Sequence, residues 1–162
     1  MKIIGERRAY PLKTRIVAII VTIFAVSFPA WASLGGDVTS VEADRAKMQA
    51  TAENKTTQAY TVHEMRAPNG VVVREFVSPV GKVFGVAWQG PTLPDLRQVL
   101  GAYFDQFTRA VQEQRTYRAG HGPVVIHDPG LVVEMGGHMR SFVGRAYLPQ
   151  MLPAGVQASE IR

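Results

Sequence analysis

The chain has 162 residues, no cysteine and a formal net charge of +5. The lack of cysteine excludes disulfides, a thiol nucleophile, a lipoprotein anchor and haem attachment through a cysteine pair. A charge of this size would favour a nucleic-acid partner if the excess of basic over acidic residues were spread along the chain, but most of that excess lies near the N-terminus.

The first 32 residues have the pattern of a secretory signal peptide. Basic residues precede an apolar run over residues 16–28, and Ala30-Trp31-Ala32 provides a small-x-small cleavage site. The apolar run is shorter than the roughly 20 residues that a membrane-spanning helix needs, which favours cleavage over an uncleaved anchor. We therefore expect a periplasmic or secreted protein, cleaved near Ala32, whose mature form starts at Ser33 and does not span a membrane.

Cleavage would remove most of the positive charge. The leader holds five Lys or Arg residues and one acid, so thirteen basic and twelve acidic residues remain and the mature net charge is +1. No basic run interleaved with aromatic residues is left, which argues against a nucleic-acid partner. The 130 remaining residues suit one compact domain.

The segment 33–58 is expected to hold a short helix and a linker. Thr39-Ser40-Val41-Glu42 has the spacing of a capping box, which predicts a helix start. Residues 52–58 are polar and are expected to form a solvated linker to a domain over residues 59–150.

Three runs rich in β-forming residues follow, at 60–65, 71–77 and 82–88. The turn sequences Pro68-Asn69-Gly70 and Ser78-Pro79-Val80-Gly81 separate them, which predicts an antiparallel meander over 59–88. Strict alternation in the third run would place two sets of side chains on opposite faces, namely Lys82, Phe84, Val86 and Trp88 on one and Val83, Gly85 and Ala87 on the other.

Apolar residues then recur at steps of three and four from Leu96 to Val111, which predicts an amphipathic helix over residues 93–115. Thr92, with Asp95 three residues later, offers a capping start. This helix is expected to cover one face of the sheet.

The C-terminal third has β-rich runs at 124–127, 131–135 and 138–146. Asp128-Pro129-Gly130 and Gly136-Gly137 are expected to be the two reversals between them. Residues 151–162 are expected to form a polar tail. The predicted fold is therefore α+β: an antiparallel β-meander with one amphipathic helix packed on a sheet face, plus a C-terminal β-hairpin unit.

Histidines are the side chains whose type alone suggests chemistry near neutral pH. His121, His127 and His138 could form a metal-ligand set, with copper as a candidate, but no His-Glu-x-x-His or close His-x-His spacing is present. Ordinary hydrogen-bonding histidines are the favoured interpretation, and no cofactor is expected. The alternative is a small periplasmic metal-binding protein or enzyme that uses these three histidines.

A serine hydrolase is not favoured. Ser78 or Ser141 could be combined with His127 and Asp128, but neither serine lies in a Gly-x-Ser-x-Gly turn. Ser78 precedes a proline in a turn, where serine is expected for conformational reasons.

A glycosidase-type pair of acids is not favoured either. Glu64 and Glu75 fall on adjacent strands and could face one another. Because Arg66 and Arg74 lie beside them, cross-strand ion pairs on a solvated face are the better interpretation.

Aromatic and basic residues could form an interaction surface if several of them cluster, although a scattered arrangement is the default expectation. Such a patch would suit an envelope protein or a polysaccharide, since arginine and aromatic side chains are the usual anchors of interfaces. The candidates are Trp88, Arg115, Tyr117, Arg118, Arg140, Arg145 and Tyr147.

Several phrases resemble one family. These are Tyr60-Thr61-Val62-His63-Glu64, the stretch from Val73 to Phe84, Ala87-Trp88-Gln89-Gly90-Pro91, and Gly137-His138-Met139-Arg140-Ser141-Phe142. The chain resembles the family called domain of unknown function 2844, small exported proteobacterial proteins. The resemblance implies a Gram-negative envelope and brings no activity or site residue. The expected function is an exported, non-enzymatic binding or structural module of that envelope.

Overall fold

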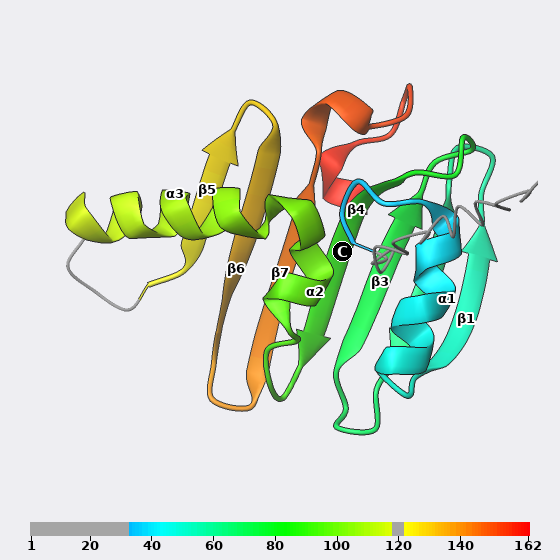
Figure 1. Cartoon of the computed structure of the whole chain (residues 1–162), viewed down its shortest axis with the longest axis horizontal. Coiled ribbons are helices and arrows are strands. Elements are labelled where there is room, and N and C mark those ends of the chain that lie inside the picture. Colours follow the sequence, from blue (N-terminus) through cyan, green and yellow to red (C-terminus); the bar gives the residue numbers. More distant parts are fainter. Residues whose placement is uncertain (1–32, 118–121) are drawn as a thin grey trace, which may run out of the picture.

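The computed structural model describes residues 33–117 and 122–162, so the leader and its expected cleavage site lie outside the described part. Seven strands form one antiparallel sheet in the order β1-β2-β3-β4-β7-β6-β5, with the helices on one face (Figure 1). The predicted α+β class with an antiparallel meander is confirmed. The strands are β1 (Thr51–Thr56), β2 (Thr61–Arg66), β3 (Val72–Val77), β4 (Val83–Gly90), β5 (Val124–Asp128), β6 (Leu131–His138) and β7 (Ser141–Tyr147).

The helices are α1 (Val38–Lys47), α2 (Leu96–Leu100) and α3 (Phe104–Tyr117), with short 3-10 turns at Gly101–Tyr103, Pro149–Met151 and Ala158–Glu160. Among the described helices, none is long and apolar enough to cross a membrane.

Two meanders make up the sheet. Strands β1 to β4 pair in chain order, strands β5 to β7 do the same, and β4 pairs with β7 in the middle. Helices α2 and α3 carry the chain from β4, near the centre, to β5 at the far edge (Figure 1). The three C-terminal strands therefore belong to the same sheet rather than to a separate hairpin unit.

The expected linker over 52–58 largely forms the edge strand β1, which pairs with β2. All six β1 side chains are exposed. A strand that is exposed on both faces needs no apolar alternation, which explains why its sequence looked like a linker.

The reversal expected at Gly136-Gly137 is also displaced. Both glycines lie inside β6, and the chain turns at Met139 and Arg140, between the paired residues His138 and Ser141. Gly137 has a φ of 133°, and a Cβ there would lie 2.8 Å from Phe142 Cα. The glycine therefore permits a close approach of two strands instead of making a turn.

The predicted helix over 93–115 forms later and in two parts. The N-cap is Asp95, whose carboxylate accepts hydrogen bonds from the backbone N–H groups of Arg97 (2.9 Å) and Gln98 (3.3 Å), so the capping residue is not Thr92. At Gly101, with a φ of 50°, α2 ends, and a Cβ there would overlap the side chain of Ser33. The interruption makes room for the segment at residues 33–36.

That N-terminal segment is tied into the fold by backbone hydrogen bonds. Leu34 N–H donates to Val99 O (3.2 Å), and Gly35 N–H donates to Val83 O (2.8 Å). The Val83 N–H in turn donates to Gly36 O (3.0 Å). The segment thus links α2 to β4, and the Leu34 side chain is buried.

The face of the sheet under the helices, called the helix face below, carries the larger core. It includes Met65, Val73, Val77, Val83, Val86, Trp88, Leu131, Val133 and Ala146, together with Val41, Leu100 and Phe107 from the helices.

A β-bulge between β3 and β4 divides the residues of β4 differently from strict alternation. Phe76 pairs with Gly85, but Val77 pairs with Val83, so one extra residue, Phe84, lies on β4. Phe84 and Ala87 therefore pack in the core of the opposite face, away from Val83, Val86 and Trp88. The expected division of residues 82–88 into large side chains on one face and small ones on the other was wrong. A bulge arises from the pairing of two strands, so the sequence of one strand does not reveal it.

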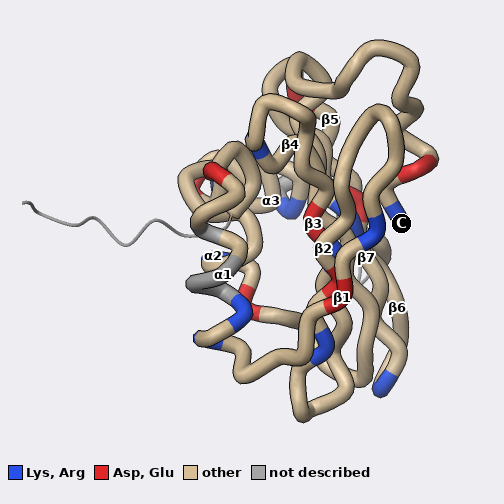
Figure 2. The backbone as a smooth tube through the Cα atoms, turned by 90° about the vertical axis from the view of Figure 1, so that its right-hand side faces the viewer, with Lys and Arg blue, Asp and Glu red and all other residues tan. Residues whose placement is uncertain are grey.

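The other face, called the open face below, is partly covered by the chain end (Figure 2). Residues 149–162 pack over Phe76 and Phe84, and Ile161 is fully buried over Gly85. The Tyr60 hydroxyl donates to Glu160 Oε2 (3.0 Å), which fixes this segment further. The expected polar tail over 151–162 is therefore a structural element.

The indole of Trp88 lies over Gly144, its partner on β7. A Cβ at Gly144 would be 2.5 Å from Trp88 Cε2, so Gly144→Ala is expected to destabilise the fold by about 1–3 kcal/mol through overpacking. Urea unfolding measures the loss. Gly130→Ala is the control, because nothing lies within 4 Å of a Cβ at that position. Equal stability of the two variants would contradict this packing.

Ile161→Ala is expected to cost about 2–4 kcal/mol, because it empties a fully buried site over Gly85. The exposed neighbour gives a matched control: Arg162→Ala should change the free energy of unfolding by less than about 0.5 kcal/mol. If both variants unfold at the same urea concentration, the chain end is not part of the core.

Candidate functional site

One cross-strand row of charged residues runs over the open face. Residues directly opposite one another in antiparallel strands share a face, with Cβ atoms roughly 4.5–5.5 Å apart. Acidic and basic residues gather midway along the strands (Figure 2). The row contains one residue from each strand: Glu53, Glu64, Arg74, Ala87, Arg145, Glu134 and Val125.

Two clusters of ion pairs hold this row together. Arg74 Nε donates to Glu64 Oε2 (2.7 Å), and Arg66 also pairs with Glu64. Arg145 donates to Glu134 Oε2 through Nε (3.0 Å) and Nη2 (2.8 Å), while His127 Nε2 lies 3.3 Å from Glu134 Oε1. The predicted ion pairing of Glu64 is confirmed.

Both carboxylates are held in the ionised form. The hydrogen bond from Arg145 lowers the pKa of Glu134 against the opposing effect of partial burial, and His127 adds to the lowering. Partial burial acts to raise the pKa of Glu64, but the hydrogen bond and the charge of Arg74, with the charge of Arg66, bring it below its ordinary value. These acids are acceptors of hydrogen bonds near neutral pH and not proton donors.

A pocket of about 420 Å³ lies beside this row on the open face. It exists because the side chains of the floor are small or absent: Ala87 on β4, and Gly136 on β6, where a Cβ would meet only Pro123 at 3.5 Å. Val125 and Val143, which are 40% and 57% exposed, form part of its apolar wall.

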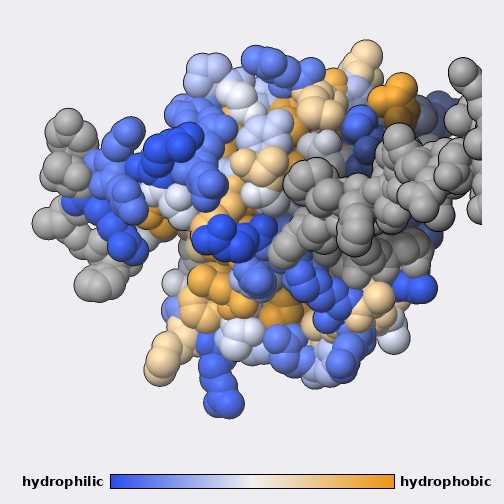
Figure 3. All heavy atoms as spheres, in the orientation of Figure 1, coloured by the Kyte–Doolittle hydropathy of each residue, from blue (hydrophilic) through white to orange (hydrophobic). Residues whose placement is uncertain are grey.

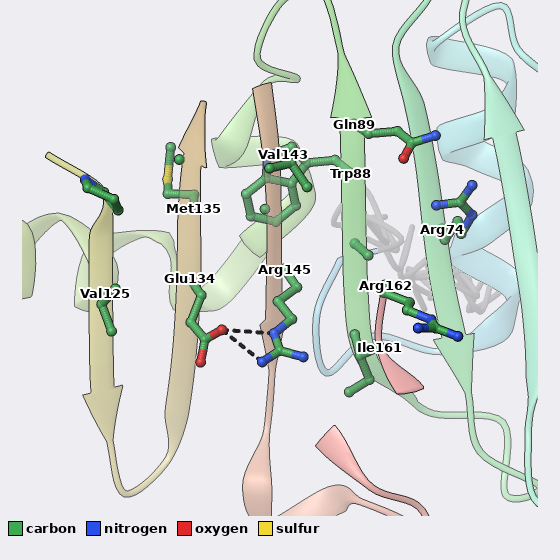
Figure 4. Close-up of a pocket in the computed structure, with 14 residues that line it drawn as sticks. Arg74, Trp88, Gln89, Val125, Glu134, Met135, Val143, Arg145, Ile161 and Arg162 are labelled. Atoms are coloured by element: carbon green, nitrogen blue, oxygen red, sulfur yellow. Dashed lines mark hydrogen bonds and ion pairs between the residues drawn. The ribbon is translucent and has the colours of Figure 1, made fainter. Parts of the chain in front are cut away.

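The guanidinium groups that have hydrogen-bonding capacity left lie on the β3 side of the pocket. Figure 4 shows Arg74 and Arg162 on this side, Val125 on the opposite side, and the Glu134–Arg145 pair between them. Within the described part of the chain, no hydrogen bond or ion pair engages the two Nη atoms of Arg74 or the guanidinium of Arg162. The pocket is therefore cationic at one end and apolar at the other.

A second pocket, of about 330 Å³, lies on the helix face, where apolar side chains reach the surface between the helices (Figure 3). Its polar groups already serve the backbone. Asp95 caps α2, and Asn69 Oδ1 accepts a hydrogen bond from Val71 N–H. No basic side chain lines this pocket, so it offers less to a ligand than the pocket on the open face.

The two described candidate histidines lie far apart. His127 is on β5, opposite Val132, and His138 is six residues further along β6, a separation of roughly 20 Å. His121 lies outside the described residues. In the ranges 33–117 and 122–162, no group of three or more potential ligands could hold a metal ion.

The serines considered as nucleophiles are not close to His127 either. Ser78 follows the end of β3, which is four strand spacings, or about 19 Å, from β5 and His127. The Ser78 hydroxyl accepts a hydrogen bond from Lys82 N–H. Ser141 is the partner of His138 at the far end of the hairpin. No triad forms from these residues.

The expected aromatic and basic patch is not a single cluster. Trp88 is only 1% exposed and lies on the helix face, because Gly144 leaves room for its ring there. Arg145 and Tyr147 share the open face, Arg115 is exposed on α3, and Arg140 is at the β6–β7 turn. Arg118 lies outside the described residues, and Tyr117 is placed only as the last residue of α3.

Glu75 is not on a solvated face. It is 2% exposed and lies on the helix face, opposite His63 and Val86, so Glu64 and Glu75 lie on opposite faces. The sequence contained a pattern that indicated this burial: Glu75 lies two residues from Val73 and from Val77, so it shares a strand face with these two core residues. Similarly, Gly136 follows Glu134 on the same face and marks a missing side chain, which could have indicated the pocket.

Glu134→Gln is expected to lower stability by roughly 0.5–1 kcal/mol at neutral pH. Because the folded-state pKa of Glu134 is below its ordinary value of 4.5, its contribution is present above that value and is lost as the pH falls through the lowered pKa. Urea unfolding at pH of about 6 and about 3 should therefore show a smaller decline in the variant. Glu113→Gln, on the exposed side of α3, is the control. Parallel declines in all three proteins would contradict a role for the pair.

Comparisons with known proteins assign the chain to a family, but that family has no described activity. Neither a curated protein nor a solved structure matches the chain. The family model described as "Protein of unknown function (DUF2844)" matches residues 30–161, which is most of the chain and all of the described fold except its last residue. The chain belongs to this family, as the resemblance of its strand and turn sequences indicated.

Proposed function

We propose that this chain is an exported, non-enzymatic binding module of the Gram-negative envelope, with the pocket on the open face as its binding site. The observation that carries the proposal is the unequal covering of this face. The chain end seals the part over Phe76 and Phe84, while the part at Val125 and Val143 stays exposed beside paired charges. Exposed apolar side chains rimmed by polar groups are typical of binding sites.

The proposed export rests on the leader and fits the start of the fold. Leu34, the first residue with backbone hydrogen bonds to α2, follows closely after the expected cleavage site at Ala32. Cleavage there would leave every described contact in the mature chain. The near-neutral mature charge then favours a partner other than nucleic acid.

A binding role is favoured over catalysis by the state of the charged groups. Glu64 and Glu134 are ionised and already accept hydrogen bonds from arginines, so neither suits proton donation at neutral pH. His127 already contacts Glu134, and His138 contacts Met139 O. The partner classes proposed from the sequence are an envelope protein or a polysaccharide, and the buried position of Trp88 removes one aromatic anchor for either.

Fractionation of cells that make the full chain tests export. We expect the protein in the periplasm or the medium, with an N-terminus at Ser33 by mass spectrometry. Ala30→Arg with Ala32→Arg, which removes the small residues of the cleavage site, should leave the longer precursor. A full-length chain in the cytoplasm, still carrying residues 1–32, would contradict the proposal.

A further inference from the structure

We propose that the pocket on the open face binds an amphipathic organic anion, with its carboxylate or phosphate head beside Arg74 and Arg162 and its apolar body against Val125, Val143 and Pro123. This inference rests on the proposed binding function and names the ligand class. It follows from three observations, which concern the donors, the charge and the shape of the pocket.

The donors are held in position and still have capacity. Arg74 is anchored by its Nε–Glu64 bond, and its side chain is only 22% exposed. An arginine bound through Nε keeps its two Nη atoms for another acceptor, and the planar guanidinium suits carboxylate or phosphate oxygens. Gln89, next along the pocket wall, and Arg162, near Ile161, add donors from β4 and from the chain end (Figure 4).

The charge at this end of the pocket favours an anion. Three guanidinium groups line the pocket, those of Arg74, Arg145 and Arg162, and two carboxylates pair with them, those of Glu64 and Glu134, so one positive charge is left over. The positive charge of Arg145 balances the negative charge of Glu134, which reduces the repulsion between Glu134 and a bound anion. A charge partly shielded from water interacts more strongly than one on an open surface.

The shape requires an apolar body behind the head. Ala87 and Gly136 leave the floor empty, Val143 on β7 lies between Gln89 and Gly136, and Val125 and Pro123 line the far side. A volume of about 420 Å³ is within the range of small-molecule sites. An inorganic anion would leave the apolar part in contact with water, and a neutral apolar molecule would leave the arginines unused. The pocket therefore suits a molecule with both parts.

Isothermal titration calorimetry with matched probes tests the proposed ligand class. The protein is used in the form in which it is isolated from the cells that produce it. Octanoate and octyl phosphate carry the two head groups on alkyl chains that differ by a single carbon, octanol lacks the charge, and acetate lacks the body. We expect saturable binding of one molecule of octanoate, octyl phosphate or both, with octanol and acetate at least about tenfold weaker. The ratio between the two anions distinguishes a fatty-acid source from a phosphate-bearing one.

Three variants locate the site. Arg74→Gln should weaken binding of the anion at least about fivefold, and Gly136→Val should abolish it by filling the floor. Arg66→Gln is the matched control, because it removes the other partner of Glu64 and the same charge without lining the pocket. Arg162→Gln, on the exposed chain end, serves as a second test of the head site should Arg74→Gln fail to fold. Thermal unfolding checks that each variant is native.

Several outcomes would overturn the proposal. The first is that octanol or acetate binds as tightly as octanoate. The second is that neither octanoate nor octyl phosphate binds. The third is that Arg66→Gln and Arg74→Gln weaken binding equally. Unchanged binding in Gly136→Val would place the ligand elsewhere. Each of these results leaves the fractionation test untouched, so failure of the ligand class can be told apart from failure of export.

Discussion

The antiparallel pairing of β4 with β7 is the interaction on which the rest of the structure depends. It joins two meanders that would otherwise be separate sheets of four and three strands. Its register sets both faces at once: it places Trp88 over Gly144 on the helix face and Ala87 beside Arg145 on the open face. A slip by one residue would exchange these two sets, moving the indole to the face that holds the ion pairs. The close fit of Trp88 on a glycine makes that alternative costly.

The sequence predicted the elements whose local pattern is strong. The hairpin around Asn69-Gly70 and the amphipathic stripe before Val111 both have periodicity that a single segment reveals. Prediction from the sequence was wrong for the elements whose structure depends on a partner that is distant in the chain. The bulge that moves Phe84 to the open face is shared by two strands, and β1 is a strand only because β2 pairs with it. The apolar residues of the chain end, Met151, Leu152, Val156 and Ile161, are spaced too irregularly to show the period of a helix or a strand.

The candidate site was harder to predict for a related reason. Residue type alone singles out histidines, serines and acids, and in this fold most of those groups are dispersed or paired with one another. The pocket is defined instead by side chains that are missing, at Gly136 and Ala87, on strands that are not neighbours in the chain. Arg74 was noticed as a partner of Glu64, which is correct, but its two remaining donors are apparent only once β3 is placed beside the chain end.

The late position of β7 and Ile161 has a consequence for how the chain matures. The central strand β4 gains its second partner only when residues near 145 have been made, and the open-face core closes only with residue 161. Pairings that are distant in sequence form slowly, because a long loop must close first. A chain shortened before residue 141 therefore leaves one edge of β4 without β7, and one shortened before residue 161 leaves the core of the open face unsealed.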